Sequence, residues 1–159
     1  MTFQTTEMFA AESAAMDGDS VPSRELLAAY DDFFNEKEIT VHSLQRLAVV
    51  MDPENKLRNG TGIRFTPEFP TYVGSGPEVM SELRCAIKGL HRGVRHSSNN
   101  WEVAHGSYCL MSFIQPFTHC NGKLARAVWK YCMGDSSTKG FLHTFHSQAL
   151  RYSRPRLDF

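Results

Sequence analysis

Hydrophobic residues recur every three or four positions along most of this chain, the spacing that places them on one face of an α-helix. The first such stripe follows Ser23, the second follows Thr40 and ends before Pro53, and the third follows Pro77. Ser and Thr are good N-caps and Pro suits the first helical position, so three helices are expected at these places. Their apolar stripes are Leu26, Leu27, Tyr30, Phe33 and Phe34; Leu44, Leu47, Val50 and Met51; Val79, Met80, Leu83, Ile87 and Leu90.

Two further segments are richer in apolar residues. Residues 100–114 are apolar on almost every side of a helix, which is typical of a central, buried helix. Residues 122–133 continue as a second central helix, and a last helix is expected over residues 140–152, before a basic, mobile tail at 151–159. The pattern predicts a mainly α fold, a helical bundle around two central helices at about 100–114 and 122–133.

Helical spacing is interrupted between residues 56 and 76, where glycines and prolines surround two short apolar runs. This pattern predicts a small β-hairpin at about residues 62–73. One interpretation is a surface hairpin that its aromatic residues hold in place. The other is a flap whose strand edge binds an extended target peptide through main-chain hydrogen bonds. The residues assigned to such a flap are Ile63, Phe65, Thr71, Tyr72 and Val73.

Composition narrows the class of protein. The chain has 159 residues, 42% hydrophobic and 21% charged, which is typical of a single soluble globular domain over residues 1–159. Lys+Arg and Asp+Glu both number 17, so neither nucleic acid nor an anionic membrane is expected as a partner. We find no secretory signal and no membrane-spanning run. The four cysteines lack CxxC spacing and are expected to be free thiols, in the cytoplasm or after delivery into a host cytosol.

The candidate chemistry lies between the two central helices, in residues 115–126. Asn121-Gly122 is the strongest turn dipeptide of the chain, and a helix that restarts there presents backbone N–H groups at its first turn. Lys123 and Arg126 lie one turn apart just beyond it. Free N–H groups beside two cations favour the binding of an anion such as a phosphate.

The same residues resemble the signature of the Fic (filamentation induced by cAMP) family, His-x-Phe-x-(Asp/Glu)-Gly-Asn-Gly-(Arg/Lys)-x-x-Arg. Phe117, Asn121, Gly122, Lys123 and Arg126 match it in register. Three positions depart from it. Gln115 stands at the catalytic histidine, His119 at the acidic residue and Cys120 at the first glycine. The resemblance implies a Fic-like fold with nucleotide or phosphate binding by Asn121, Gly122, Lys123 and Arg126.

The family reaction that the resemblance implies is transfer of AMP from ATP to a Ser, Thr or Tyr hydroxyl of a protein. A histidine is the general base in that reaction, and Gln115 cannot take a proton at any relevant pH. The acidic position normally holds Mg²⁺, a hard cation that prefers oxygen ligands, so His119 argues against a metal site. ATP remains a candidate ligand. We therefore favour a weak or inactive transferase, a pseudoenzyme that still binds nucleotide, phosphate or protein.

Residues 1–20 carry a second resemblance. Ser13-Ala14-Ala15-Met16-Asp17-Gly18 is similar to the inhibitory motif of the family, (Ser/Thr)-x-x-x-Glu-(Gly/Asn), with Asp17 in place of glutamate. In the family this helix packs on the active site and its carboxylate pairs with the last arginine of the signature. Here the pair is Asp17 and Arg126. The alternative is a short surface helix that ends at Gly18.

Two alternative functions stay open. In one, the chain is an active transferase in which His119 is the base, or which uses another phosphorylated donor. In the other, it is a non-enzymatic adaptor or antitoxin-like module that binds a partner protein through the flap.

Overall fold

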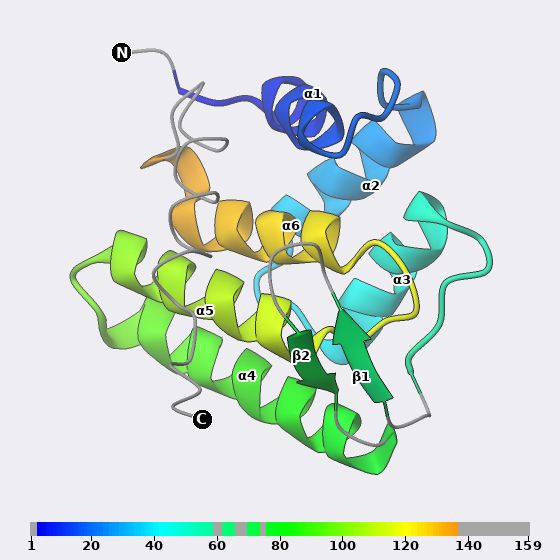
Figure 1. The fold of residues 1–159 in the computed structure, drawn as a ribbon. Coiled ribbons are helices and arrows are strands. Elements are labelled where there is room, and N and C mark those ends of the chain that lie inside the picture. The colour runs from blue at the N-terminus through cyan, green and yellow to red at the C-terminus, as the bar shows by residue number, and fades with distance from the viewer. Residues whose placement is uncertain (1–2, 59–61, 66–69, 74–75, 137–159) are drawn as a thin grey trace.

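The computed structural model describes residues 3–58, 62–65, 70–73 and 76–136, and Figure 1 shows their arrangement. The described part is mainly helical, as predicted. Its elements in chain order are α1 (Thr6–Met16), α2 (Arg24–Phe34), α3 (Val41–Met51), β1 (Gly62–Phe65), β2 (Pro70–Val73), α4 (Gly76–His96), α5 (Asn100–Ile114), α6 (Asn121–Met133) and the 3₁₀ turn η1 (Gly134–Ser136).

Helix α6 is the centre of the fold. Every residue from Leu124 to Lys130 is buried, on all sides of the helix. It packs against α5 along its length, and α1, α2 and α3 contact its other sides. Helix α4 packs on α5 and lies apart from α6. The order α4, α5, α6 leaves α5 as the layer between an outer helix and the core.

Local capping explains where several helices begin. Ser23 Oγ accepts the N–H of Leu26 at the start of α2. Thr40 and Ser43 form a reciprocal capping box at the start of α3, and α3 ends at Met51, two residues before Pro53. Each cap satisfies backbone donors that the first helical turn leaves open. The helices predicted after Ser23 and Thr40 are thus confirmed.

Helix α1 is longer than the segment predicted from the sequence. It begins at Thr6, with Thr5 as its N-cap, and includes the residues that showed no clear periodicity. Phe9 is fully buried, and its ring lies edge-on to those of Tyr30 and Phe34, with both centroids 5.2 Å away. Helix α1 is therefore part of the hydrophobic core, and the motif that begins at Ser13 forms only its last turn.

Helix α5 differs from its prediction in burial. Ala104, Tyr108 and Met111 are buried against α6, but Leu110 is 42% exposed and Phe113 is 48% exposed. A helix that is apolar all round is expected to be covered all round. Within the described residues, one side of α5 is left open.

Two strands lie in the segment interpreted as a hairpin. β1 and β2 pair antiparallel, with Gly62 opposite Val73 and Ile63 opposite Tyr72, and β2 contacts α5. The helix predicted at residues 140–152 and the tail at 151–159 lie outside the described residues. Among the described helices, we find none that is both long and apolar enough to cross a membrane.

Candidate functional site

The loop between α5 and α6 begins with a left-handed residue. Gln115 has φ 44° and ψ 62°, it is only 9% exposed, and its N–H donates to the carbonyl of Met111. A left-handed residue after a helix turns the chain sharply and satisfies one of the last carbonyls. The turn directs Pro116 and Phe117 back into the fold, where Phe117 is fully buried.

Asn55 holds the middle of this loop. Asn55 is buried, with only 5% of its surface exposed. Its Oδ1 accepts the His119 N–H at 3.0 Å and the Thr118 hydroxyl at 3.1 Å, and its Nδ2 donates to the His119 carbonyl at 2.9 Å. One amide side chain thereby fixes the backbone of His119 from both sides.

Arg58 holds the start of the loop. Its guanidinium donates to the carbonyl of Ile114 at 2.8 Å and to the carbonyl of Gln115, and its own N–H donates to the Pro116 carbonyl at 2.9 Å. These carbonyls are at the C-terminal end of α5, where the helix dipole favours a cation. Asn55 and Arg58 were missed in the sequence because their contacts are with backbone atoms 56 to 64 residues away.

Asn121 closes the loop on itself. Its Oδ1 accepts the Phe117 N–H at 2.9 Å, and its Nδ2 donates to the Phe117 carbonyl at 2.8 Å. The side chain predicted to bind nucleotide therefore makes both of these bonds within the loop. Its place in the structure favours a role in shaping the loop.

Helix α6 starts without a side-chain cap. Its N-cap residue is Cys120, with φ 59° and ψ 20° and no capping hydrogen bond from the side chain. By contrast, Thr5, Ser23, Thr40 and Asn99 each cap the helix that follows. The first N–H groups of a helix and its dipole give that end a partial positive charge. At α6 the side chain of the N-cap residue Cys120 does not offset this partial positive charge.

Two carboxylates from the N-terminal segment lie on the cations of α6. Arg126, 4% exposed, donates from Nη2 to Asp17 Oδ2 at 2.5 Å and from Nε to Ser13 Oγ at 2.8 Å. Lys123 Nζ contacts Asp19 Oδ2. Helices α1 and α6 contact each other, with α1 above the start of α6 in Figure 1. The pair predicted between Asp17 and Arg126 is thus in contact despite the shorter side chain of aspartate.

Two glycines shape this contact. Gly18 has φ 72°, which lets the chain turn out of α1 so that Asp19 can reach Lys123. A Cβ added to Gly122 would lie 3.3 Å from Arg126 Nη1. Gly122 therefore leaves room for the guanidinium beside the first turn of α6.

The three residues that depart from the family signature are placed differently. Gln115 is buried, His119 is exposed, and Cys120 is half-buried. Burial raises the pKa of the Cys120 thiol, although nearby Lys123 opposes the shift. Cys120 is therefore a protonated thiol near neutral pH and a poor nucleophile. Burial likewise raises the pKa of Tyr30 to about 12, against the opposing charge of Arg126.

Within the described part of the chain, no three His, Cys, Asp or Glu side chains lie together as a metal site requires. Ser13, Asp17, Lys123 and Arg126 are brought together, and Asn121 and Gly122 lie beside them. The five residues assigned to the flap lie on β1 and β2. They therefore belong to other elements than the α1–α6 contact.

Comparison with known proteins supports the fold. Against solved structures, the chain is similar to a Fic family protein from Desulfovibrio desulfuricans G20, with a TM-score of 0.62 and 13% sequence identity over 92% of this chain. It covers 55% of the length of that protein. No protein-family model matches the chain, and no curated protein matches it in sequence. At this identity the similarity shows a Fic-like fold.

Proposed function

We propose that this chain is a Fic-fold protein that binds the phosphates of a nucleotide at the start of α6 and transfers AMP weakly or not at all. The observation that carries the proposal is the position of Asp17 and Asp19 on Arg126 and Lys123. Carboxylates and phosphates are oxyanions that the same charged donors bind. Two carboxylates at an uncapped helix start mark the place where phosphate oxygens fit.

The groups for the chemical step are missing from the same loop. An amide at position 115 accepts no proton, and loss of a general base costs about 10² to 10⁴ in rate. His119, at the position of the metal-holding acid, is a nitrogen ligand where Mg²⁺ prefers oxygen. The proposal is therefore a binding site for ATP, without a requirement for Mg²⁺ and without efficient transfer to a target hydroxyl.

In this proposal the N-terminal helix α1 regulates ATP binding at the start of α6. Ser13, Asp17 and Gly18 correspond to the inhibitory motif of the resemblance, and Asp17 contacts Arg126. ATP has to displace the carboxylates of Asp17 and Asp19 from their cations. Because Phe9 anchors α1 in the core, displacement is expected at the end of α1 rather than by release of the whole helix.

Calorimetry with ATP, with and without Mg²⁺, tests the proposal on the natural chain and on Lys123→Ala. Lys37→Ala is the control, since Lys37 is exposed between α2 and α3. We expect binding to the natural chain, little effect of Mg²⁺, and about tenfold or greater weakening in Lys123→Ala, the loss typical of a charged hydrogen bond. Absence of ATP binding, or Mg²⁺-dependent AMP transfer to the chain or a target, contradicts the proposal.

An active enzyme with His119 as base is the second candidate. Its support is that His119 is exposed while Asn55 fixes its backbone, so an imidazole is presented at a defined place on the surface. In this case labelled ATP gives AMP transfer, and His119→Ala abolishes it while Gln115→Ala does not. Transfer that persists in His119→Ala rejects this candidate.

A further inference from the structure

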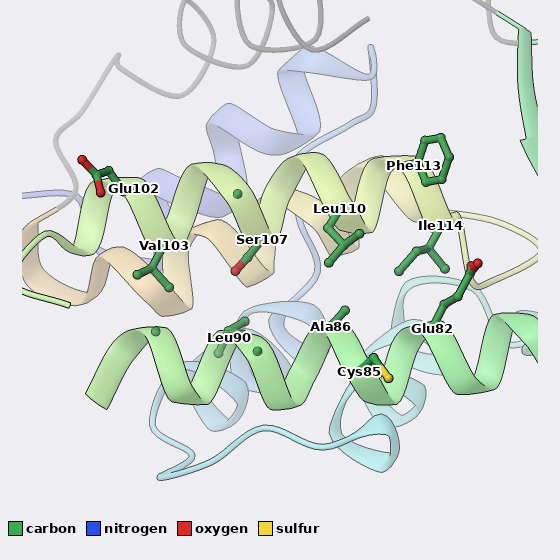
Figure 2. A pocket seen from close by; sticks show the side chains of 13 residues that line it. Glu82, Cys85, Ala86, Leu90, Glu102, Val103, Ser107, Leu110, Phe113 and Ile114 are labelled. Carbon is green, nitrogen blue, oxygen red and sulfur yellow. The ribbon is translucent and has the colours of Figure 1, made fainter. Parts of the chain in front are cut away.

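A groove runs between α4 and α5, on the side of α5 that faces away from α6 (Figure 2). Its volume is about 500 Å³, and most of its surface is apolar. Glycines and small or apolar side chains line its length, and a glutamate stands at each end. The lining residues used below are Glu82, Gly89, Glu102, Gly106, Leu110 and Phe113.

The floor of the groove is backbone rather than side chain. A Cβ added to Gly89 or to Gly106 would meet no atom within 4 Å. Gly89 and Gly106 are both exposed although they lie in the interior of helices, where glycine costs about 1 kcal/mol relative to alanine. Such open positions accept a large side chain from a partner close to the helix axis.

The wall of the groove exposes large apolar side chains. Leu110 and Phe113 are 42% and 48% exposed, and in Figure 2 Leu110 points toward α4 while Phe113 lies on the edge of α5 away from α4. A continuous apolar surface of this kind is typical of a binding surface rather than of a face turned to water.

The ends of the groove are acidic. In Figure 2, Glu102 lies at one end and Glu82 at the other. Neither carboxylate forms an ion pair with any described residue. From Glu102 to Ile114, α5 rises about 18 Å at 1.5 Å per residue. The groove therefore offers an apolar track of about three turns of helix with a negative charge at each end.

We propose that this groove binds an amphipathic helix of another protein chain, three to four turns long, with an apolar face and a Lys or Arg at each end. Helix-in-groove binding uses large apolar anchors spaced at i, i+3 or i+4 and i+7. Gly93 packs on Val103 in the antiparallel α4–α5 pair, which brings Gly89 and Gly106 to the same level of the groove. One anchor therefore lies over both glycines, and the basic ends pair with Glu82 and Glu102. This interaction surface is separate from the α6 site and does not depend on nucleotide binding.

A second copy of the chain fits less well. A two-fold arrangement that seats Leu110 of one copy on Gly106 of the other runs the two α5 helices antiparallel. Glu102 of one copy then approaches the end of the groove that carries Glu82 in the other, because α4 and α5 are themselves antiparallel (Figure 1). Like charges brought together oppose this dimer.

Fluorescence anisotropy with two labelled 15-residue helical peptides tests the proposal. Both carry Leu and Phe at the anchor spacing, and one has Lys at each end where the other has Glu. We expect the Lys-ended peptide to bind at least tenfold more tightly, and Glu82→Gln with Glu102→Gln to remove most of that difference. Added salt is expected to reduce the difference as well, because exposed charge pairs are screened.

Gly106→Leu fills the floor and is expected to weaken binding at least tenfold while keeping the helix, since leucine favours helix over glycine. Val50→Leu is the control, as Val50 is 41% exposed on α3, outside the groove. Equal binding of the two peptides, unchanged binding in Gly106→Leu, or no saturable binding up to about 1 mM overturns the proposal. So does a dimer, seen by light scattering of the chain alone, that Gly106→Leu dissociates.

Discussion

The loop at residues 115–120 and the start of α6 at residues 121–126 form two halves of one stretch, and different atoms hold each half. In residues 115–120 the contacts are mainly with backbone groups: Arg58 binds the carbonyls of Ile114 and Gln115, and Asn55 binds both backbone groups of His119. In residues 121–126 the contacts come from side chains. Asn121 binds Phe117, Lys123 contacts Asp19, and Arg126 binds Ser13 and Asp17.

This difference explains which positions depart from the signature. A residue held by its backbone can change its side chain while the loop keeps its shape, and Gln115, His119 and Cys120 all lie in that half. A residue held by its side chain loses the contact when it changes, and Asn121, Lys123 and Arg126 all match the signature. The side chains that shape the stretch are thus separate from the positions that depart from the signature, and substitutions can test where the boundary lies.

The largest effect is expected at Asn55, the main support of the first half. Asn55→Ala removes three hydrogen bonds, to the N–H and carbonyl of His119 and to the Thr118 hydroxyl, each worth about 1 kcal/mol. We expect about 3 kcal/mol lower free energy of unfolding, measured by urea denaturation. Asn35→Ala, at an exposed helix end, is the control and is expected to cost less than about 1 kcal/mol. Equal losses for the two variants reject a supporting role of Asn55.

A smaller loss is expected at Asn121, the support within the second half. Asn121→Ala removes two hydrogen bonds to Phe117, worth about 1 kcal/mol each. We expect a loss of about 2 kcal/mol in the same denaturation experiment, together with weaker ATP binding because the start of α6 is no longer fixed. If Asn121→Ala keeps full stability and loses only ATP binding, the side chain contacts the nucleotide directly.

Cys120 tests the backbone of the first half. It has φ 59°, a region in which a residue with a side chain is strained by about 1 to 2 kcal/mol and glycine is not. Glycine also costs some chain entropy, so Cys120→Gly is expected to raise the free energy of unfolding by about 0.5 kcal/mol. Cys109→Gly, inside α5, is expected to lower it by about 1 kcal/mol. A loss in both variants rejects the strain at Cys120.

The smallest effect is expected at His119. Because only its backbone is bound by Asn55, His119→Ala is expected to change the free energy of unfolding by less than about 0.5 kcal/mol, as for other surface substitutions. A loss above about 1.5 kcal/mol contradicts the view that residues 115–120 are held by their backbone, since the imidazole of His119 then supports the loop.

Much of the fold follows from local patterns. Ser23 and Thr40 mark helix starts because capping is a short-range interaction. The start of α6 could be located because the turn residues Asn121-Gly122 are adjacent to it in sequence. The sequence pattern marked only the end of α1, because the residues before Ser13 show no clear period, and Ser13 itself is buried where Arg126 binds it. Arg126 is 113 residues from Ser13 in sequence, so no local pattern reveals this contact.

The remaining differences have the same origin. Asn55 and Arg58 bind backbone groups of a distant loop, which no spacing of residue types reveals. The burial of α5 was overestimated because its composition gives no hint that α4 covers it only partly and leaves Leu110 and Phe113 open. Residue types predicted the short-range features of this chain but not its long-range partners, and the one long-range pair that was expected, Asp17 with Arg126, came from the family resemblance.

The most direct measurement is ATP binding by calorimetry to the variant Asp17→Asn with Asp19→Asn, compared with the natural chain. If Lys123 and Arg126 form an anion site that these carboxylates occupy, their removal is expected to strengthen ATP binding about tenfold, or 1.4 kcal/mol. AMP transfer is expected to stay weak or undetectable in both chains. Unchanged or weaker ATP binding in the variant contradicts the account.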